Sequence, residues 1–202
     1  MEFFIPKSEA IFEEEIKKSR FITYLRHTEG MEQSKAFLAE IKALHPSARH
    51  WCWATVAGMP TDSQQYSFSD DGEPSGTAGK PMLSYLLGSG LGEITAVVVR
   101  YYGGIQLGTG GLVKAYGNGV QQALLSLETV RKVLRENYRL QCEYEQFNTL
   151  SHLLQEWDIE ILDQQFCEKI ELRWAINPVQ VEQIQATLTQ RFAGRLALEK
   201  EE

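Results

Sequence analysis

The feature that most constrains this chain is an apolar run that ends in a cation, two tyrosines and a cluster of glycines. Residues 94–99 are rich in valine and other strand-forming residues, and such a run is typical of a strand covered on both faces. Arg100, Tyr101 and Tyr102 follow, and five glycines lie between positions 103 and 111. Because glycine has no Cβ, its backbone lets another group approach closely. The pattern predicts a central strand, then a glycine-rich turn, then a helix.

The start of that helix is a candidate anion site. We predict Thr109 as the N-cap, which leaves the amides of Gly110 and Gly111 open at the helix start. These amides, the helix dipole and the nearby Lys114 can together hold an anion. Alternatively, the glycines form tight turns and let the helix pack closely on the sheet. The two explanations are compatible.

Standard nucleotide-binding fingerprints do not fit the glycine pattern. A phosphate-binding loop that ends at Gly79-Lys80 would need glycine at position 74 and serine or threonine at position 81, where the chain has Pro74 and Pro81. A dinucleotide fingerprint that starts at Gly108 would need glycine at position 113, where the chain has valine. The sequence therefore supports neither nucleoside triphosphate hydrolysis nor NAD binding, and we predict no cofactor.

A polar segment over residues 58–79 contains the second candidate site. It exceeds the usual length of a connection, and long loops of this kind tend to be functional or mobile. Asp70, Asp71 and Glu73 can bind a hard cation such as Mg²⁺ or accept hydrogen bonds from a ligand, and Lys80 can neutralise a carboxylate or a phosphate. A solvated turn that needs no ligand explains the same residues. The spacing is not that of a calcium loop, and we predict no metal site.

The pattern of residues 1–136 predicts one domain with strands and helices in the order β-β-α-β-(β)-α-β-α. Its predicted elements are two strands within 11–27, a helix over 37–44, strands over 50–57 and near 65–68, a helix over 81–87, and the strand and helix described above. Trp51 and Trp53 alternate along their strand, so both side chains are expected on one side of the sheet.

Residues 137–202 predict a second, smaller domain. Its expected elements are strands over 138–144, 159–166, 169–176 and 196–198, with helices over 147–157 and from 178 to near 194. Asn177 followed by Pro178 is a strong start signal for the second helix. The order β-α-β-β-α-β is the ferredoxin-like arrangement.

Charge and composition narrow the class of partner. The net charge is −7, and residues 137–202 alone contain six basic and twelve acidic residues. Within 77–135 the balance reverses, because six basic residues face only Glu93 and Glu128. Such a chain is not expected to coat duplex DNA, whose binding depends on many phosphate contacts. It can still hold one phosphate, a short single strand or an acidic partner segment.

The cellular location can also be predicted. No apolar run approaches the roughly 20 residues that span a bilayer, so no membrane association is expected. Three cysteines far apart in sequence fit a reducing compartment better than a disulfide framework. We expect a cytoplasmic protein, and the sequence does not predict its oligomeric state.

Two blocks of sequence resemble a known family. Residues 69–81 (Ser-Asp-Asp-Gly-Glu-Pro-Ser-Gly-Thr-Ala-Gly-Lys-Pro) and 97–108 (Val-Val-Val-Arg-Tyr-Tyr-Gly-Gly-Ile-Gln-Leu-Gly) are similar to the signature of the YigZ/IMPACT family, in the right order and separation. The resemblance implies a two-domain α+β protein. Its N-terminal domain would have the fold of the second domain of ribosomal protein S-five, and its C-terminal domain would be ferredoxin-like. It also implies a link to the regulation of translation.

Three functional hypotheses follow. The first is a non-enzymatic protein that binds RNA, the ribosome or a translation factor through a face made by Arg100, Tyr101, Tyr102, Gly103, Gly104, Gly108, Thr109, Gly110 and Lys114. The second is an enzyme that acts on a small phosphorylated or nucleotide-like metabolite and uses Asp70, Asp71 and Glu73. The third is an adapter whose acidic second domain docks a basic protein. The first two differ most clearly if the acidic residues and the glycine turn line one pocket, because that favours a ligand site.

Overall fold

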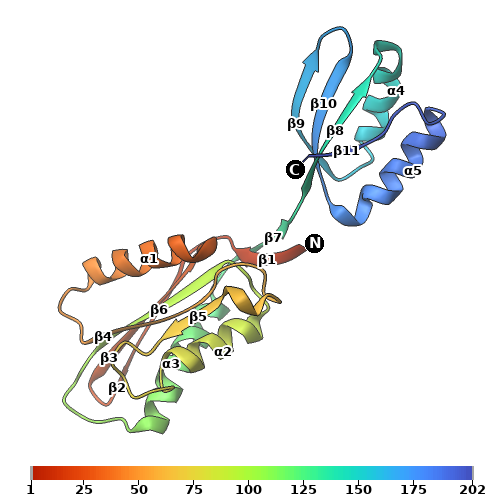
Figure 1. Ribbon diagram of the computed structural model, residues 1–202. Coiled ribbons are helices and arrows are strands. Elements are labelled where there is room, and N and C mark those ends of the chain that lie inside the picture. The colour runs from red at the N-terminus through yellow and green to blue at the C-terminus, as the bar shows by residue number, and fades with distance from the viewer. Residues whose placement is uncertain (1, 202) are drawn as a thin grey trace. The chain divides into compact units, whose positions relative to one another are not determined.

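The computed structural model describes residues 2–201, and the chain divides into two compact units (Figure 1). The first unit is Phe3–Lys132. The second unit contains residues 133–201 together with Glu2. The boundary predicted from the sequence, after residue 136, stays a prediction. Each unit has its own hydrophobic core.

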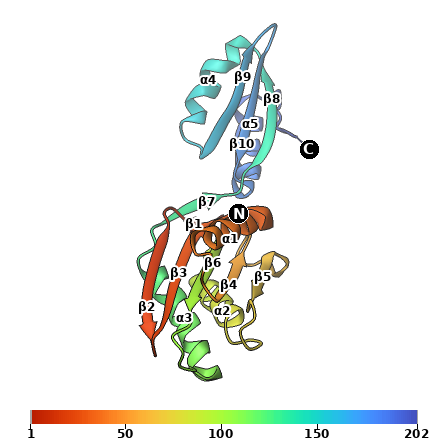
Figure 2. The ribbon, with the colours of Figure 1, turned by 90° about the vertical axis from the view of Figure 1, so that its left-hand side faces the viewer.

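The first unit is built on a five-stranded antiparallel sheet. Its strands, from one edge to the other, are β2 (Ala10–Ile16), β3 (Ser19–His27), β6 (Ile94–Tyr101), β4 (His50–Val56) and β5 (Tyr66–Ser69) (Figure 2). The predicted central strand is confirmed as β6, which is buried along seven of its eight residues. Its pairing with β4 places His50 opposite Arg100.

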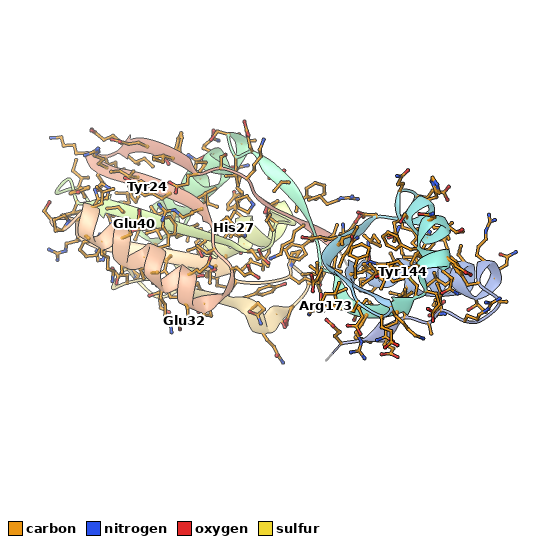
Figure 3. All side chains as sticks on the ribbon, turned by 90° about the horizontal axis from the view of Figure 1, so that it is seen from above. Tyr24, His27, Glu32, Glu40, Tyr144 and Arg173 are labelled. Carbon is orange, nitrogen blue, oxygen red and sulfur yellow. The ribbon has the colours of Figure 1, made fainter. Side chains whose placement is uncertain are left out.

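Helices cover both faces of this sheet (Figure 1). On one face α2 (Gly79–Ser89) and α3 (Thr109–Leu125) pack their apolar sides on residues such as Val98 and Phe21. On the other face α1 (Gly30–Leu44) covers Val97 and Val99, and the two tryptophans of β4 pack beside it as predicted. The helix is also tied to β3, because Arg26 donates a hydrogen bond of 2.8 Å to Glu40 on α1; Glu40 and Tyr24 of β3 are labelled in Figure 3.

The structure differs from the predicted elements of this unit in two places. A two-stranded sheet joins β1 (Glu2–Pro6) to β7 (Thr129–Val133), and neither strand was predicted. The predicted N-cap of α3 is wrong, because Gly108 holds that position and the helix already begins at Thr109. Gly108 has φ 76°, in the left-handed region that glycine enters without a steric penalty. A short 3₁₀ turn, η1 (Ser63–Gln65), lies in the polar segment before β5.

The second unit has the predicted β-α-β-β-α-β order. Its elements are β8 (Glu136–Cys142), α4 (Tyr144–Leu154), β9 (Ile159–Phe166), β10 (Ile170–Ile176), the 3₁₀ turn η2 (Pro178–Gln180), α5 (Val181–Arg191) and β11 (Glu199–Lys200). The sheet order β11-β8-β10-β9 places the first and third strands at the centre, as in ferredoxin-like domains. Trp174 and Leu172 of β10 are fully buried against the helices.

Two details of the second unit correct the predictions. Asn177 accepts a hydrogen bond from the Val179 amide, but it caps the 3₁₀ turn η2, and the α-helix starts only at Val181. The last strand was predicted over 196–198; instead Leu196 is buried in the core and β11 follows it. At the opposite edge of the sheet, β9 leaves Ile161, Leu162 and Phe166 exposed.

None of the helices in the described part of the chain is both long and apolar enough to cross a membrane. All three cysteines are free: Cys52 and Cys142 are buried, and Cys167 is exposed.

Candidate binding site

A cavity of about 520 Å³ opens in the first unit where β6 ends and α3 begins. It is lined by Arg49 and His50 at the start of β4, by Glu73 and Pro74, and by Arg100, Tyr102, Gln106, Leu107, Gly108, Thr109 and Leu112. Its volume lies in the range of sites for small ligands. The segment 70–73, called the acidic loop below, and residues 103–111, called the glycine turn, therefore contribute to one pocket.

Arg100 and Glu73 form a buried ion pair in this cavity. The guanidinium Nη1 of Arg100 lies 2.6 Å from Oε1 of Glu73, and the Arg100 residue is only 5% exposed. Tyr116 of α3 donates its hydroxyl to the same carboxylate oxygen at 2.7 Å. A second, longer hydrogen bond of 3.3 Å joins Arg100 to the Ser19 hydroxyl. The Nε atom of Arg100 has no hydrogen-bond partner among residues 2–201. The end of β6 and the loop after β5 thus bring a buried charged pair together in this cavity.

Two acceptor atoms in the cavity are left without a protein partner. Oε1 of Glu73 takes both bonds just described, so Oε2 accepts none from the described residues. Nδ1 of His50 lies 2.7 Å from the Asp71 carbonyl and donates to it, which leaves Nε2 as the acceptor of the neutral ring. This Nε2 lies 3.9 Å from Oε1 of Glu73. The pocket lining therefore contains two side chains, Glu73 and His50, that each have an acceptor atom without a protein partner.

The start of α3 borders the same cavity through Gly108, Thr109 and Leu112, and it has unused hydrogen-bond donors. Within the described chain, the amides of Thr109, Gly110 and Gly111 make no hydrogen bond, since the first internal bond of the helix runs from Leu112 to the Gly108 carbonyl. Three open amides at the positive end of a 17-residue helix favour an anion. Arg49 is exposed beside them and is positioned by the bond from its amide to the Arg100 carbonyl, at 2.9 Å.

The glycines of the turn differ in what the fold requires of them. A Cβ on Gly103 would lie 2.0 Å from the Lys18 carbonyl, so the turn between β2 and β3 requires glycine there. Gly104 and Gly108 have positive φ. Gly110 has neither requirement: its φ is ordinary and a Cβ would meet nothing within 4 Å. The tight-turn explanation accounts for three of these glycines but not for Gly110.

The other carboxylates of the acidic loop are used inside the protein. Asp70 accepts hydrogen bonds from the amides of Gly76, Ala78 and Gly79, and Asp71 accepts one from Trp51. The structure places only Glu73 of the three in the cavity lining. No cluster of three His, Cys, Asp or Glu side chains that could hold a metal ion occurs between residues 2 and 201.

Burial raises the pKa of two groups near Glu73, the Tyr116 hydroxyl and the Cys52 thiol. It raises the pKa of the Tyr116 hydroxyl, with further contributions from Cys52 and Glu73, so Tyr116 stays a hydrogen-bond donor. Burial likewise raises the pKa of the Cys52 thiol, whose Sγ donates to the Asp70 carbonyl at 3.0 Å. Cys52 is therefore a packed thiol and not a nucleophile.

The remaining predicted residues are spread around the pocket. Tyr102 lines it and is 47% exposed, whereas Tyr101 points to the α1 side of the sheet and bonds His45 at 2.9 Å. Lys80 and Lys114 are exposed but do not line the cavity. The sequence did not predict Arg49 and His50 as site residues, because only strand pairing brings the start of β4 beside the end of β6. Gln106 also lines the cavity and belongs to the predicted glycine turn, but it was not singled out there.

Fold and pocket together define a two-domain α+β protein with a polar cavity in its N-terminal unit. The family model of the Impact N-terminal domain matches residues 17–124, and that of a domain of unknown function (DUF1949) matches residues 140–195. This chain belongs to the IMPACT family, as its two sequence blocks predicted.

Relatives match over nearly the whole chain. An "IMPACT family member" of Haemophilus influenzae is 59% identical over 198 residues, which are 98% of this chain and 96% of the relative. "IMPACT family member YigZ" of Escherichia coli is 56% identical, over 96% of this chain and 95% of that protein. A crystal structure described as that of "an hypothetical protein" has a TM-score of 0.73 at 55% identity and covers 100% of this chain and 98% of its own. The predicted two-domain α+β fold is confirmed.

Proposed function

We propose that this chain is a binding protein linked to translation and that its cavity holds a phosphate group of single-stranded RNA. The observation that carries the proposal is the start of α3, where the amides of residues 109–111 are open and Thr109 lines one cavity with Arg49 and Arg100. Oriented amides, a helix N-terminus and arginine are the groups that proteins use to bind phosphate. The proposed location of such a protein is the cytoplasm.

The surroundings of the cavity favour a single strand over a duplex. One pocket of about 520 Å³ contacts few phosphates, whereas duplex binding depends on many. Tyr102 is half exposed at the same site, and a tyrosine ring beside a phosphate site can stack on an unpaired base. The face therefore suits a short unpaired segment of RNA, free or on the ribosome.

The proposal can be tested by fluorescence anisotropy with labelled single-stranded RNA and by co-sedimentation with purified ribosomes. We expect Arg49→Ala to weaken RNA binding about fivefold, as for a partly exposed charge contact of roughly 1 kcal/mol, and to reduce the salt dependence. Lys35→Ala is the matched control, because Lys35 is an exposed cation on α1 and does not line the cavity. Equal binding by wild type and Arg49→Ala would contradict the proposal, as would no binding of RNA or ribosomes.

A second candidate function is binding or conversion of a small phosphorylated or nucleotide-like metabolite. The buried carboxylate of Glu73 in a ligand-sized cavity favours it, and Glu73 is the acidic-loop residue that would act. Thermal-shift screening against nucleotides, with and without Mg²⁺, tests this candidate, since a ligand at about 100 times its dissociation constant adds roughly 2.7 kcal/mol of stability. No shift across the panel would contradict it.

A further inference from the structure

We propose that the cavity selects a ribonucleotide over a deoxyribonucleotide and that Glu73 and His50 read the ribose hydroxyl next to the bound phosphate. This inference rests on the proposed function. The open amides of α3 account for the phosphate of the ligand, and this inference concerns the sugar beside that phosphate.

Glu73 has an unused acceptor although it is almost buried. Its side chain lines the cavity and is only 4% exposed, and its Oε2 atom has no hydrogen-bond partner within the described chain. A carboxylate beside an anion site repels a bare phosphate, and Arg100 offsets that repulsion only in part. The arrangement is favourable when the ligand brings a hydrogen-bond donor to this oxygen.

His50 is the second residue with an unused acceptor. Its Nδ1–H is fixed by the Asp71 carbonyl, so the ring presents Nε2 as an acceptor, and its side chain is 17% exposed in the cavity lining. Glu73 and His50, the two residues with an unused acceptor, thus line the same cavity as Thr109 at the start of α3. A ligand that fits this lining has a hydroxyl group close to a phosphate, and the single hydrogen of that hydroxyl can be accepted by either Glu73 or His50.

A ribonucleotide is a ligand of this kind. In a nucleic acid the ribose 2′-hydroxyl is the donor that deoxyribose lacks, and it is the group by which proteins tell RNA from DNA. The pocket also contains Tyr102, whose ring can stack on the base. Phosphate, ribose and base therefore each have a complementary group in one cavity.

The test compares ligands on the wild-type protein, so it does not depend on a variant that folds. Labelled RNA, 2′-O-methyl RNA and deoxyuridine-containing DNA of the same sequence are titrated by anisotropy. We expect RNA to bind two- to tenfold more tightly than either analogue, the range that one net hydrogen bond gives. Equal binding of all three would overturn the inference and leave the proposed RNA-binding function standing. Failure of all three to bind would overturn both.

A variant assigns the effect to the site. His50→Phe keeps a planar ring and removes Nε2, so we expect the ratio of RNA affinity to DNA affinity to fall toward one. Its unfolding midpoint is measured alongside, and Lys35→Ala serves again as the control. An unchanged RNA preference in a folded His50→Phe protein would overturn the assignment.

A competition experiment tests whether a free ribonucleotide enters the same site as RNA. Uridine monophosphate and deoxyuridine monophosphate are each added to the RNA complex. If the ribonucleotide competes better, the selection for ribose is supported and free nucleotides also enter the site. If the two compete equally, the preference does not reside in this cavity and the inference is wrong.

Discussion

At the scale of single residues, the cavity depends on a charge pair that the protein buries almost completely. Arg100 and Glu73 are both shielded from water, and each is the main counter-charge of the other. A buried ion pair contributes little net stability, but the loss of one partner leaves an uncompensated charge. The pair therefore holds the Arg100 and Glu73 side chains in place in the lining of the cavity.

The first prediction concerns this pair. Arg100→Met is expected to lower the free energy of unfolding by about 3–5 kcal/mol, since the Glu73 carboxylate stays buried without its cation. The double variant Arg100→Met/Glu73→Gln is expected to lose less than the sum of the single changes, because no buried charge remains. Urea unfolding of the three variants measures the coupling. Additive losses would show that the two groups do not interact.

The second prediction separates stability from binding at Gly110. A methyl group at this position meets no other atom, and alanine is the better helix former, so Gly110→Ala is expected to raise stability by up to about 1 kcal/mol. The same methyl group occupies the approach to the helix amides, and RNA binding is expected to weaken. Thermal melts and anisotropy measure the two effects. The control is Gly88→Ala, on the exposed side of α2, which is expected to gain stability and bind normally.

At the scale of elements, α2 is capped by a residue far from its own start in sequence. The N-cap position, Ala78, has no side chain that can accept a hydrogen bond. Asp70 instead accepts bonds of 2.8–3.0 Å from the amide of Gly79 at the first helical position, from that of Ala78, and from that of Gly76 in the loop before the helix. A carboxylate at a helix N-terminus is favourable for both hydrogen bonding and the dipole. The acidic loop is thus held in place by the helix that follows it, which also positions Glu73.

The third prediction follows from this cap. Asp70→Ala is expected to lower the free energy of unfolding by about 2 kcal/mol or more, because several partly buried amides lose a charged acceptor. Asp62→Ala is the control, since Asp62 caps only the short turn η1 with a single exposed bond. Urea midpoints compare them. Equal small losses at both positions would mean that the loop is not held through Asp70.

The fourth prediction concerns the end of α1 and depends on pH. His45 lies between the Tyr24 and Tyr101 hydroxyls, at 2.6 and 2.9 Å, and burial lowers the pKa of its ring, with Arg20 acting in the same direction and Glu13 against it. Because the folded protein takes up the proton less readily than the unfolded chain, stability is present above the unfolded pKa of about 6.5 and declines as the pH falls below it.

Unfolding midpoints at pH 7.5 and 5.5 measure this dependence. We expect the wild type to lose more stability between the two pH values than His45→Gln, which has no proton to gain. His152→Gln makes the same change at an exposed position of the second unit and serves as the matched control for the substitution. An identical slope in His45→Gln and wild type would contradict the prediction.

At the scale of the whole molecule, the described residues form three buried apolar clusters that share no residue, two in the first unit and one in the second. The cavity is lined entirely by residues between 49 and 112, all within the first unit. Damage to one core is therefore expected to leave the other unit folded, because each buries its own apolar surface.

The fifth prediction uses this independence. Leu150 is fully buried in the second unit, and Leu150→Ala is expected to destabilise that unit by about 2–5 kcal/mol. RNA binding and the melting of the first unit should not change. Hydrogen exchange resolved by peptide distinguishes the units. Weakened binding with an intact first unit would show that the second unit takes part in the site.

The sequence predicted the parts of this architecture that depend on local pattern. The β6 run, the helix at 109–125 and the β-α-β-β-α-β order are visible in apolar periodicity, and all three are present. The pairing of β1 with β7 could not be predicted, since both strands are short and far apart in sequence. Arg49 and His50 were missed for the same reason, because their position beside Arg100 follows from register and not from any nearby residue.

The exposed edge of the second unit has a practical consequence. Strand β9 ends its sheet, and the unpaired backbone there adjoins exposed Ile161 and Leu162. An open strand of this kind can add a strand from another molecule, and charged neighbours such as Glu160 and Asp163 oppose that addition. Concentrated samples are therefore the conditions in which self-association through this edge should first limit solubility.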